Sequence, residues 1–116
     1  GTITCSFVSG GSVQSLENFF TIVGNYSNSK GTATVDGTTY TYCLKLESST
    51  SVKFTLAASY SMRLYFASTE TGNIKIDGVK KTSATNMLEE TLDAGAHELT
   101  KGDTRNLFYI KLEPVI

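Results

Sequence analysis

Apolar and polar residues alternate with a period of two along most of this chain, and turn residues separate the alternating runs. In Val52–Leu56 the apolar side chains fall on one face and the polar ones on the other, and Asn73–Ile76 repeats the pattern. The pairs Asp36–Gly37 and Asp77–Gly78 lie between such runs, and Asp-Gly pairs readily adopt the positive φ angles of tight type I′ hairpins. The pattern predicts an all-β fold, an antiparallel, jelly-roll-like β-sandwich of short strands.

The chain has room for one such sandwich. Strands are expected over Ile3–Val8, Phe19–Tyr26, Gly31–Val35, Thr39–Glu47, Val52–Ala57, Met62–Ala67, Asn73–Ile76, Val79–Lys81, Met87–Leu92, His97–Thr100 and Leu107–Leu112. The segment Gly10–Asn18 is rich in Gly and Ser and predicts a loop or a single turn of helix. A length of 116 residues fits one domain with a continuous core, so residues 1–116 are expected to form a single module. The strand-like start without Met favours a piece of a larger, secreted, multi-modular protein.

Composition and charge exclude several classes of binding partner for this chain. Hydrophobic residues make up 40% of the chain and charged residues 18%, which is too apolar for a disordered segment. The net charge of −1 argues against a nucleic-acid-binding protein, because such modules usually carry a basic excess. The uncharged stretches are short and laced with polar residues, so a membrane span is not expected. We expect a monomer that binds neither nucleic acid nor membrane.

The two cysteines leave one question open. Cys5 and Cys43 could pair in an oxidising compartment, but no Cys or His spacing typical of zinc is present. Alternation places Cys43 on the face opposite Leu44, whereas Cys5 shares an inward face with Phe7, and a bulge would change this placement. No cofactor is expected, and a structural calcium ion is left open.

The sequence offers few catalytic candidates. His97 is the only histidine, and a lone histidine provides neither a triad nor a metal set. Glu89 and Glu90 are adjacent on an expected strand and therefore point to opposite faces, so they cannot grip one glycosidic bond. We expect no catalytic residues.

Binding is the better-supported class of function. The chain has no Trp, although flat crystalline glucans are usually gripped by rows of large aromatic rings. An acidic polysaccharide offers a carboxylate on every sugar, and lysines can pair with these carboxylates through charge-assisted hydrogen bonds. The composition therefore favours an acidic sugar chain over a crystalline glucan.

Four stretches carry a family resemblance. They are Val23–Thr32, Tyr40–Ser48, Asn73–Gly78, and His97–Asp103 running into Asn106–Ile110. Together they resemble the family 77 carbohydrate-binding modules appended to bacterial pectate lyases, and the likeness spans Phe19 to Leu112. The resemblance implies a secreted β-sandwich that binds homogalacturonan of low methyl esterification through lysines. It also implies a covalently linked enzyme, such as a pectate lyase, that the module holds on the plant cell wall.

The resemblance also points to particular residues. The positions that fall within the matching motifs are the lysines Lys30, Lys45, Lys101 and Lys75, with Tyr26 and Tyr40 as stacking partners. Alternation places Lys45 outward on its strand, while Lys30 and Lys101 lie in expected loops.

Two alternatives from other classes stay open. One is a structural or adhesion sandwich that contacts protein, because a sandwich fold does not determine function. The other is a small uronate lyase that uses Lys101 near Arg105 to abstract a proton.

Overall fold

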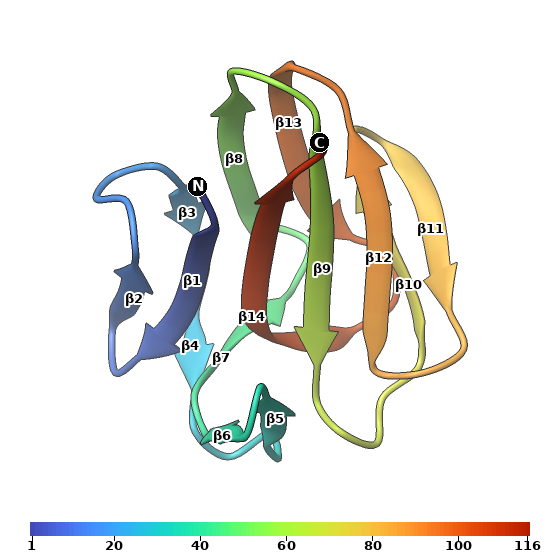
Figure 1. Ribbon diagram of the computed structural model, residues 1–116. Coiled ribbons are helices and arrows are strands. Elements are labelled where there is room, and N and C mark those ends of the chain that lie inside the picture. The colour runs from blue at the N-terminus through green and yellow to red at the C-terminus, as the bar shows by residue number, and fades with distance from the viewer.

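Fourteen strands form two antiparallel sheets packed face to face and one separate hairpin (Figure 1). A computed structural model describes residues 1–116. The seven-stranded sheet runs in the order β12-β9-β14-β1-β2, with β7 beside β14 and β4 beside β7. Its strands are β1 (Ile3–Val8), β2 (Gly11–Gln14), β4 (Tyr26–Ser27), β7 (Cys43–Leu46), β9 (Tyr60–Phe66), β12 (Met87–Leu92) and β14 (Arg105–Pro114).

The five-stranded sheet lies behind the first in Figure 1 and runs in the order β11-β10-β13-β8-β3. Its strands are β3 (Thr21–Val23), β8 (Ser51–Leu56), β10 (Gly72–Ile76), β11 (Val79–Ser83) and β13 (Gly95–Lys101). The hairpin consists of β5 (Ala33–Val35) and β6 (Thr38–Tyr40). The chain forms no helix, so none of its segments is a helix that could cross a membrane. The predicted antiparallel β-sandwich is confirmed.

A core of 20 buried residues fills the space between the two sheets. On β8, Val52, Phe54 and Leu56 are buried in this core, whereas Lys53 and Thr55 are exposed, as the alternation predicts. Each fully buried apolar side chain of this size contributes about 1.5–3 kcal/mol relative to an exposed one. Burial of one face of each sheet therefore fixes the strand register, because a slip by one residue would turn the apolar set outward.

Both Asp-Gly pairs form the predicted tight hairpins. Asp36 and Gly37 have φ angles of 49° and 82°, and Asp77 and Gly78 have φ angles of 52° and 79°. Positive φ at both central positions is what a type I′ turn requires. The first turn joins β5 to β6, and the second joins β10 to β11.

Two expected strands are each divided in the structure. The run Phe19–Tyr26 becomes β3 in one sheet and β4 in the other, and Thr39–Glu47 becomes β6 in the hairpin and β7 in the seven-stranded sheet. The first break lies at Gly24, where a Cβ atom would be 2.9 Å from Leu44 Cδ1. The backbone passes this closely over Leu44 as it changes sheets, which only glycine allows.

The expectation of a loop or helical turn over Gly10–Asn18 is wrong for its first part. Residues Gly11–Gln14 form β2, which pairs with β1 in a hairpin that turns at Gly10 with a φ of 70°. The Gln14 side chain then closes the following loop, because its Oε1 accepts a 2.8 Å hydrogen bond from Phe20 N and its Nε2 donates a 3.0 Å bond to Phe20 O. The neighbouring strand stabilises a segment whose own composition favours a loop.

The cysteines are both free and lie on opposite faces of the seven-stranded sheet. Cys5 belongs to the main core, whereas Cys43 packs with Phe108 in a small cluster beneath the β5–β6 hairpin. Burial raises the pKa of Cys5 to about 12 and that of Cys43 to about 11, so both remain thiols at neutral pH. The fold does not depend on a disulfide.

The turn between β10 and β11 is anchored by His97. Its Nδ1 lies 2.6 Å from Asp77 Oδ2, and its Nε2 lies 2.7 Å from the Asp93 carbonyl oxygen. Burial alone would lower the His97 pKa, but the hydrogen bonds and negative charges of Asp77 and Asp93 outweigh it and raise the pKa above 6.5. The ring therefore gains a proton more readily in the folded chain than in the unfolded one.

We expect this contact to stabilise the fold more in acid than in base. Because the folded-state pKa is raised, the stabilisation is complete below the unfolded value and is lost as pH rises through the folded value. The difference in unfolding free energy between the native chain and His97→Gln should be larger at about pH 5 than at about pH 9. Urea unfolding at the two pH values measures it, and a pH-independent difference would contradict the assignment.

Candidate functional site

The charges of three lysines from separate segments affect the pKa values of two residues beside β4, namely Cys43 and Glu47. Lys45 Nζ lies 3.6 Å from Glu47 Oε2. The hydrogen bond from Asn25 lowers the pKa of Glu47 most, and the charges of Lys45 and Lys101 lower it further. Burial raises the pKa of Cys43, while the charges of Lys30 and Lys45 oppose that rise. Lys45 and Lys101 thus both lower the pKa of Glu47, and Lys45 and Lys30 both oppose the rise of the Cys43 pKa, but only Lys45 forms an ion pair in this region.

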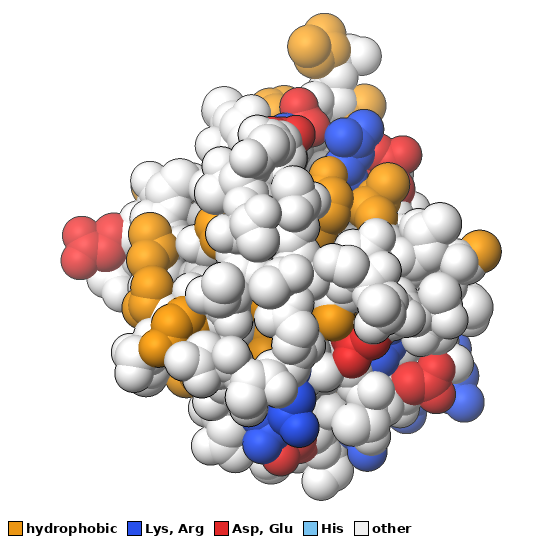
Figure 2. Space-filling view, turned by 90° about the horizontal axis from the view of Figure 1, so that it is seen from below, with side chains coloured by type: hydrophobic (Ala, Val, Ile, Leu, Met, Phe, Trp, Pro, Cys, Tyr) orange, Lys and Arg blue, Asp and Glu red, His pale blue; other side chains and the backbone are white.

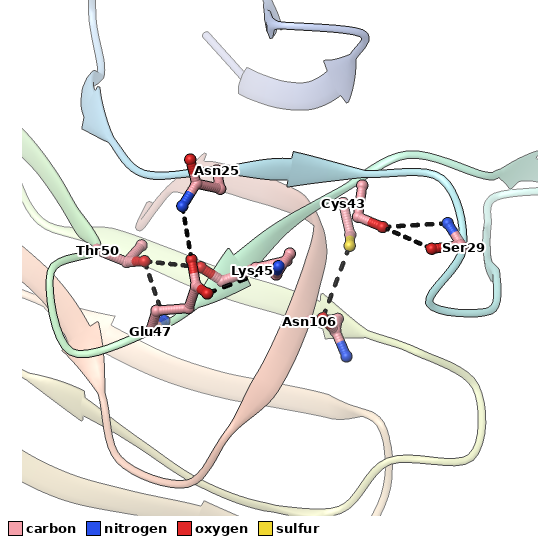
Figure 3. A network of polar contacts seen from close by, with 8 residues as sticks. Asn25, Ser29, Cys43, Lys45, Glu47, Thr50 and Asn106 are labelled. Carbon is pink, nitrogen blue, oxygen red and sulfur yellow. Dashed lines mark hydrogen bonds and ion pairs between the residues drawn. The ribbon is translucent and has the colours of Figure 1, made fainter.

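The backbone of Lys45 is fixed from both sides (Figure 3). Its N–H donates a 2.9 Å bond to the Asn25 carbonyl, and its own carbonyl accepts a 2.7 Å bond from Thr50 Oγ1. Leu44 and Leu46 on either side are fully buried, as alternation predicts. The Lys45 side chain is one-third exposed, so its ammonium group is accessible on a rigid strand.

Glu47 is the acidic partner within this region. Its Oε1 accepts a 2.9 Å hydrogen bond from Asn25 Nδ2, and its backbone N–H donates to Thr50 Oγ1 at 3.0 Å. Figure 3 shows the side chains of Asn25, Lys45 and Glu47 converging from neighbouring segments. An exposed pair such as Lys45–Glu47 contributes little to the stability of the fold. Asn25 and Glu47 both fall within the matching motifs, but nothing in their spacing indicates the contact.

Lys30 extends from the loop between β4 and β5. The loop is ordered by Ser27, whose Oγ accepts a 3.1 Å bond from Ser29 N, and Asn28 Nδ2 lies 3.4 Å from the Tyr42 hydroxyl. Lys30 itself is exposed. The loop thus presents Lys30 to solvent, as expected from its sequence.

Lys101 is the last residue of β13, which corrects the expectation that it lies in a loop, and its side chain is half-buried. The next residue, Gly102, packs so tightly that a Cβ atom would lie 2.9 Å from the Asn73 carbonyl oxygen. Asp103 then pins the turn to β10, since Asn73 N donates a 2.9 Å bond to its Oδ2 and Asp103 N donates a 3.0 Å bond to Asn73 O. The backbone at Lys101 is therefore held in a fixed position at the end of the sheet.

The remaining sequence candidates occupy other surroundings. Lys75 lies on β10 between the inward Ile74 and Ile76, so it faces outward from the five-stranded sheet, and no ion pair joins it to the other lysines. Tyr26 is half-buried against the main core, with its ring 5.9 Å from that of Phe7.

Tyr40 belongs to the β5–β6 hairpin. Its ring lies 5.0 Å from that of Tyr109, on the outer face of the seven-stranded sheet. Burial is the first cause that raises the Tyr40 pKa, and the neighbouring Tyr109 adds to it. Tyr40 thus packs against its own hairpin and Tyr109. The lysine charges, in contrast, affect the pKa values of Glu47 and Cys43.

Charged side chains at the lower end of the molecule are scattered rather than gathered into one patch. Figure 2 shows the lower end of the molecule, where basic side chains form a few separate groups, each beside an acidic one. Most of the face is uncharged, in keeping with the net charge of −1. A small net charge produces no broad positive field, so the charge that a ligand would meet here is set by individual side chains.

The structure provides no support for the lyase alternative. Arg105 is 1% exposed, with its guanidinium carbon 3.5 Å from the centre of the Phe66 ring, so it cannot act beside Lys101 on a bound sugar. No three His, Cys, Asp or Glu side chains cluster closely enough to hold a metal ion.

Comparison with known proteins defines the class. Over residues 1–110 the chain matches the family described as carbohydrate binding module 77. A solved structure from work on glycan recognition in the Ruminococcus flavefaciens cellulosome is 39% identical with a TM-score of 0.87, and the match covers 99% of this chain and 95% of that one. The fold and these matches together define a carbohydrate-binding module. The chain belongs to family 77 of these modules, which bind carbohydrate and are not catalytic.

Two further solved structures are only weakly similar to this chain. A Podospora anserina β-(1,4)-mannanase with a CBM35 module is 12% identical with a TM-score of 0.46, and the match covers 100% of this chain and 28% of that one. The catalytic unit of an α-1,3-glucanase from Streptomyces thermodiastaticus is 12% identical with a TM-score of 0.38, covering 86% of this chain and 27% of that one. No curated protein matches the chain.

Proposed function

We propose that this module binds homogalacturonan of low methyl esterification through Lys30, Lys45 and Lys101. The observation that supports the proposal most is the position of the Lys45 ammonium group, which is one-third exposed on a rigid strand and lies 3.6 Å from a carboxylate oxygen of Glu47. The charge of Lys101 also lowers the pKa of Glu47. A uronate carboxylate can take the same kind of position, with charge-assisted hydrogen bonds from the ammonium groups. Lys75, Tyr26 and Tyr40 are secondary candidates for contacts further along a sugar chain.

The biological role proposed for this binding is adsorption outside the cell. The module would act as a secreted, monomeric domain and hold a covalently linked enzyme, such as a pectate lyase, on the plant cell wall. The similarity to a structure from a bacterial cellulosome supports an extracellular setting. Each exposed ion pair contributes only about 0.2–1 kcal/mol, so several contacts along one chain are needed for micromolar affinity. Linkage to a second binding domain would raise the overall avidity.

The ester content of pectin tests this proposal. Binding to polygalacturonate should exceed binding to highly methylated pectin by roughly tenfold or more, because methylation removes the charge that the lysines pair with. The affinity for polygalacturonate should also fall as salt rises, since the Debye length shortens to about 3 Å at about 1 M ionic strength. Titration calorimetry with both polymers at low and high salt measures both effects. Equal binding to the two polymers would disprove the lysine mechanism, and binding to neither would favour the protein-contacting alternative.

A further inference from the structure

A second hollow lies on the five-stranded sheet, away from the three lysines. It is an open groove of about 760 Å³, whereas the two other hollows in the molecule measure about 280 and 340 Å³. Its lining comes from the segment before β3, from β3, β8 and β13, and from the β10–β11 turn, and it includes Phe19, Thr21, Lys53, Thr55, Asp77 and Glu98. This volume is within the usual range for small-ligand sites, about 300–1,000 Å³. None of Lys30, Lys45 and Lys101 lines it.

The strand register arranges the polar groups of this groove in rows. Thr21 is paired with Lys53, and Lys53 is paired with Glu98, so a hydroxyl, an ammonium and a carboxylate lie side by side across three strands. The next row pairs Thr55 with Ala96, whose small side chain leaves room above the sheet. Paired residues in an antiparallel sheet point to the same face. The groove therefore presents donors and acceptors a few ångströms apart.

One wall of the groove is held rigid before any ligand binds. Asp77 Oδ1 accepts a 2.7 Å bond from Glu98 N, while its Oδ2 lies 2.6 Å from His97 Nδ1. Glu98 Oε2 accepts a 2.9 Å bond from Ser51 Oγ, which leaves Oε1 as a free acceptor. Lys53 is exposed and takes part in none of the ion pairs in the structure. The carboxylates of Asp77 and Glu98 are fixed by these hydrogen bonds, so they lose little entropy when a ligand binds.

An aromatic rim adds an apolar surface. Phe19 is half-buried, with its ring 5.0 Å from that of Phe20 and 6.1 Å from that of Phe54. Sites for small molecules combine such apolar surface with a small number of placed polar groups. The C–H face of a sugar ring fits this surface while its hydroxyls reach the polar rows.

We infer that this groove is a second binding site, specific for a neutral polysaccharide. The groove holds two carboxylates, those of Asp77 and Glu98, beside the single ammonium group of Lys53, whereas Lys45 and Lys101 share the one carboxylate of Glu47, so a uronate chain would meet an excess of like charge in the groove. Sugar hydroxyls avoid this repulsion, because each can donate to a carboxylate and accept from an ammonium or a threonine. One face of the module then binds neutral glycan while the lysines bind an acidic one. This inference does not depend on the ligand of the lysine site.

Affinity electrophoresis in glucomannan, β-(1,4)-galactan, arabinan, xyloglucan and arabinoxylan tests the groove. The native module should be retarded by at least one of these neutral polymers, and excess polygalacturonate should not release it. The double variant Lys53→Ala/Thr55→Ala should lose tenfold or more of that affinity. Both side chains are exposed, so the variant should unfold at the native temperature. Lys45→Ala is the matched control and should bind the neutral polymer as the native module does.

Three results would overturn the inference. They are the absence of retardation by all five polymers, unchanged binding by the double variant, and loss of neutral-polymer binding by Lys45→Ala. The first two would show that the groove binds no neutral glycan, and the third would place that binding at the lysines. If the native module binds a neutral polymer through the groove but not polygalacturonate, the groove stands and the proposed pectin ligand fails.

Discussion

Replacing Arg105 with alanine is expected to lower the free energy of unfolding by about 3 kcal/mol or more. Arg105 is the bulkiest of the fully buried side chains, and its guanidinium lies over the Phe66 ring at 3.5 Å. Its Nη1 donates a 3.0 Å bond to the Gly72 carbonyl, and Nη2 donates a 3.4 Å bond to the Glu70 carbonyl. Alanine would leave a cavity over Phe66 and remove the donors for these partly buried carbonyls.

The Arg105 charge itself is already costly to bury. Burial lowers its pKa, while the charges of Glu70 and Asp103 partly restore it, and Nε has no hydrogen-bond partner. Arg105→Lys should therefore also be destabilising, because a lysine keeps the buried charge without the planar fork that reaches two carbonyls.

Urea unfolding of the two variants measures the effect. Arg63→Ala provides the control, since Arg63 is a partly exposed arginine paired with Glu89 at 2.7 Å and its loss should change stability little. An Arg105→Ala variant that unfolds at the native urea concentration would show that the neighbouring side chains close the cavity and satisfy the carbonyls.

Local patterns predicted the parts of the fold in which each strand buries one face. Alternation placed Val52–Leu56 and Met87–Leu92 correctly, and the Asp-Gly pairs marked two hairpins. The strand β2 escaped prediction because its Gly and Ser residues favour a loop, and pairing with β1 outweighs that preference. Chain segments that change sheets, as at Gly24, carry no local signal for the change.

The candidate site was predictable only in part, for a similar reason. The outward position of Lys45 follows from the buried Leu44 and Leu46 beside it. Its contact with Glu47, two residues further along, is consistent with the same alternation, which places both side chains on one face. The support from Asn25 depends on β4 lying next to β7, which no spacing in the sequence reveals. Likewise, nothing in the sequence around Arg105 indicates that its guanidinium is buried against the Phe66 ring.

Replacing Lys45 with alanine is expected to weaken binding to polygalacturonate by roughly tenfold or more, with almost no change in melting temperature. The backbone of Lys45 is fixed by bonds to Asn25 and Thr50, so its ammonium is better placed before binding than one on a loop. Lys30→Ala and Lys101→Ala should weaken binding in the same direction, because their charges act on the same region. Titration calorimetry gives the affinities and calorimetric melting gives the stabilities.

Two further variants decide what a loss at Lys45 means. Lys53→Ala removes an exposed lysine on the other sheet and should leave polygalacturonate binding unchanged. Lys45→Ala also leaves the Glu47 carboxylate without its cationic neighbour at 3.6 Å, and that charge would repel a uronate. The double variant Lys45→Ala/Glu47→Gln removes this repulsion while the glutamine oxygen can still accept from Asn25. If Lys45 contacts the ligand directly, the double variant stays weak, whereas native affinity in the double variant would mean that Lys45 only neutralises Glu47.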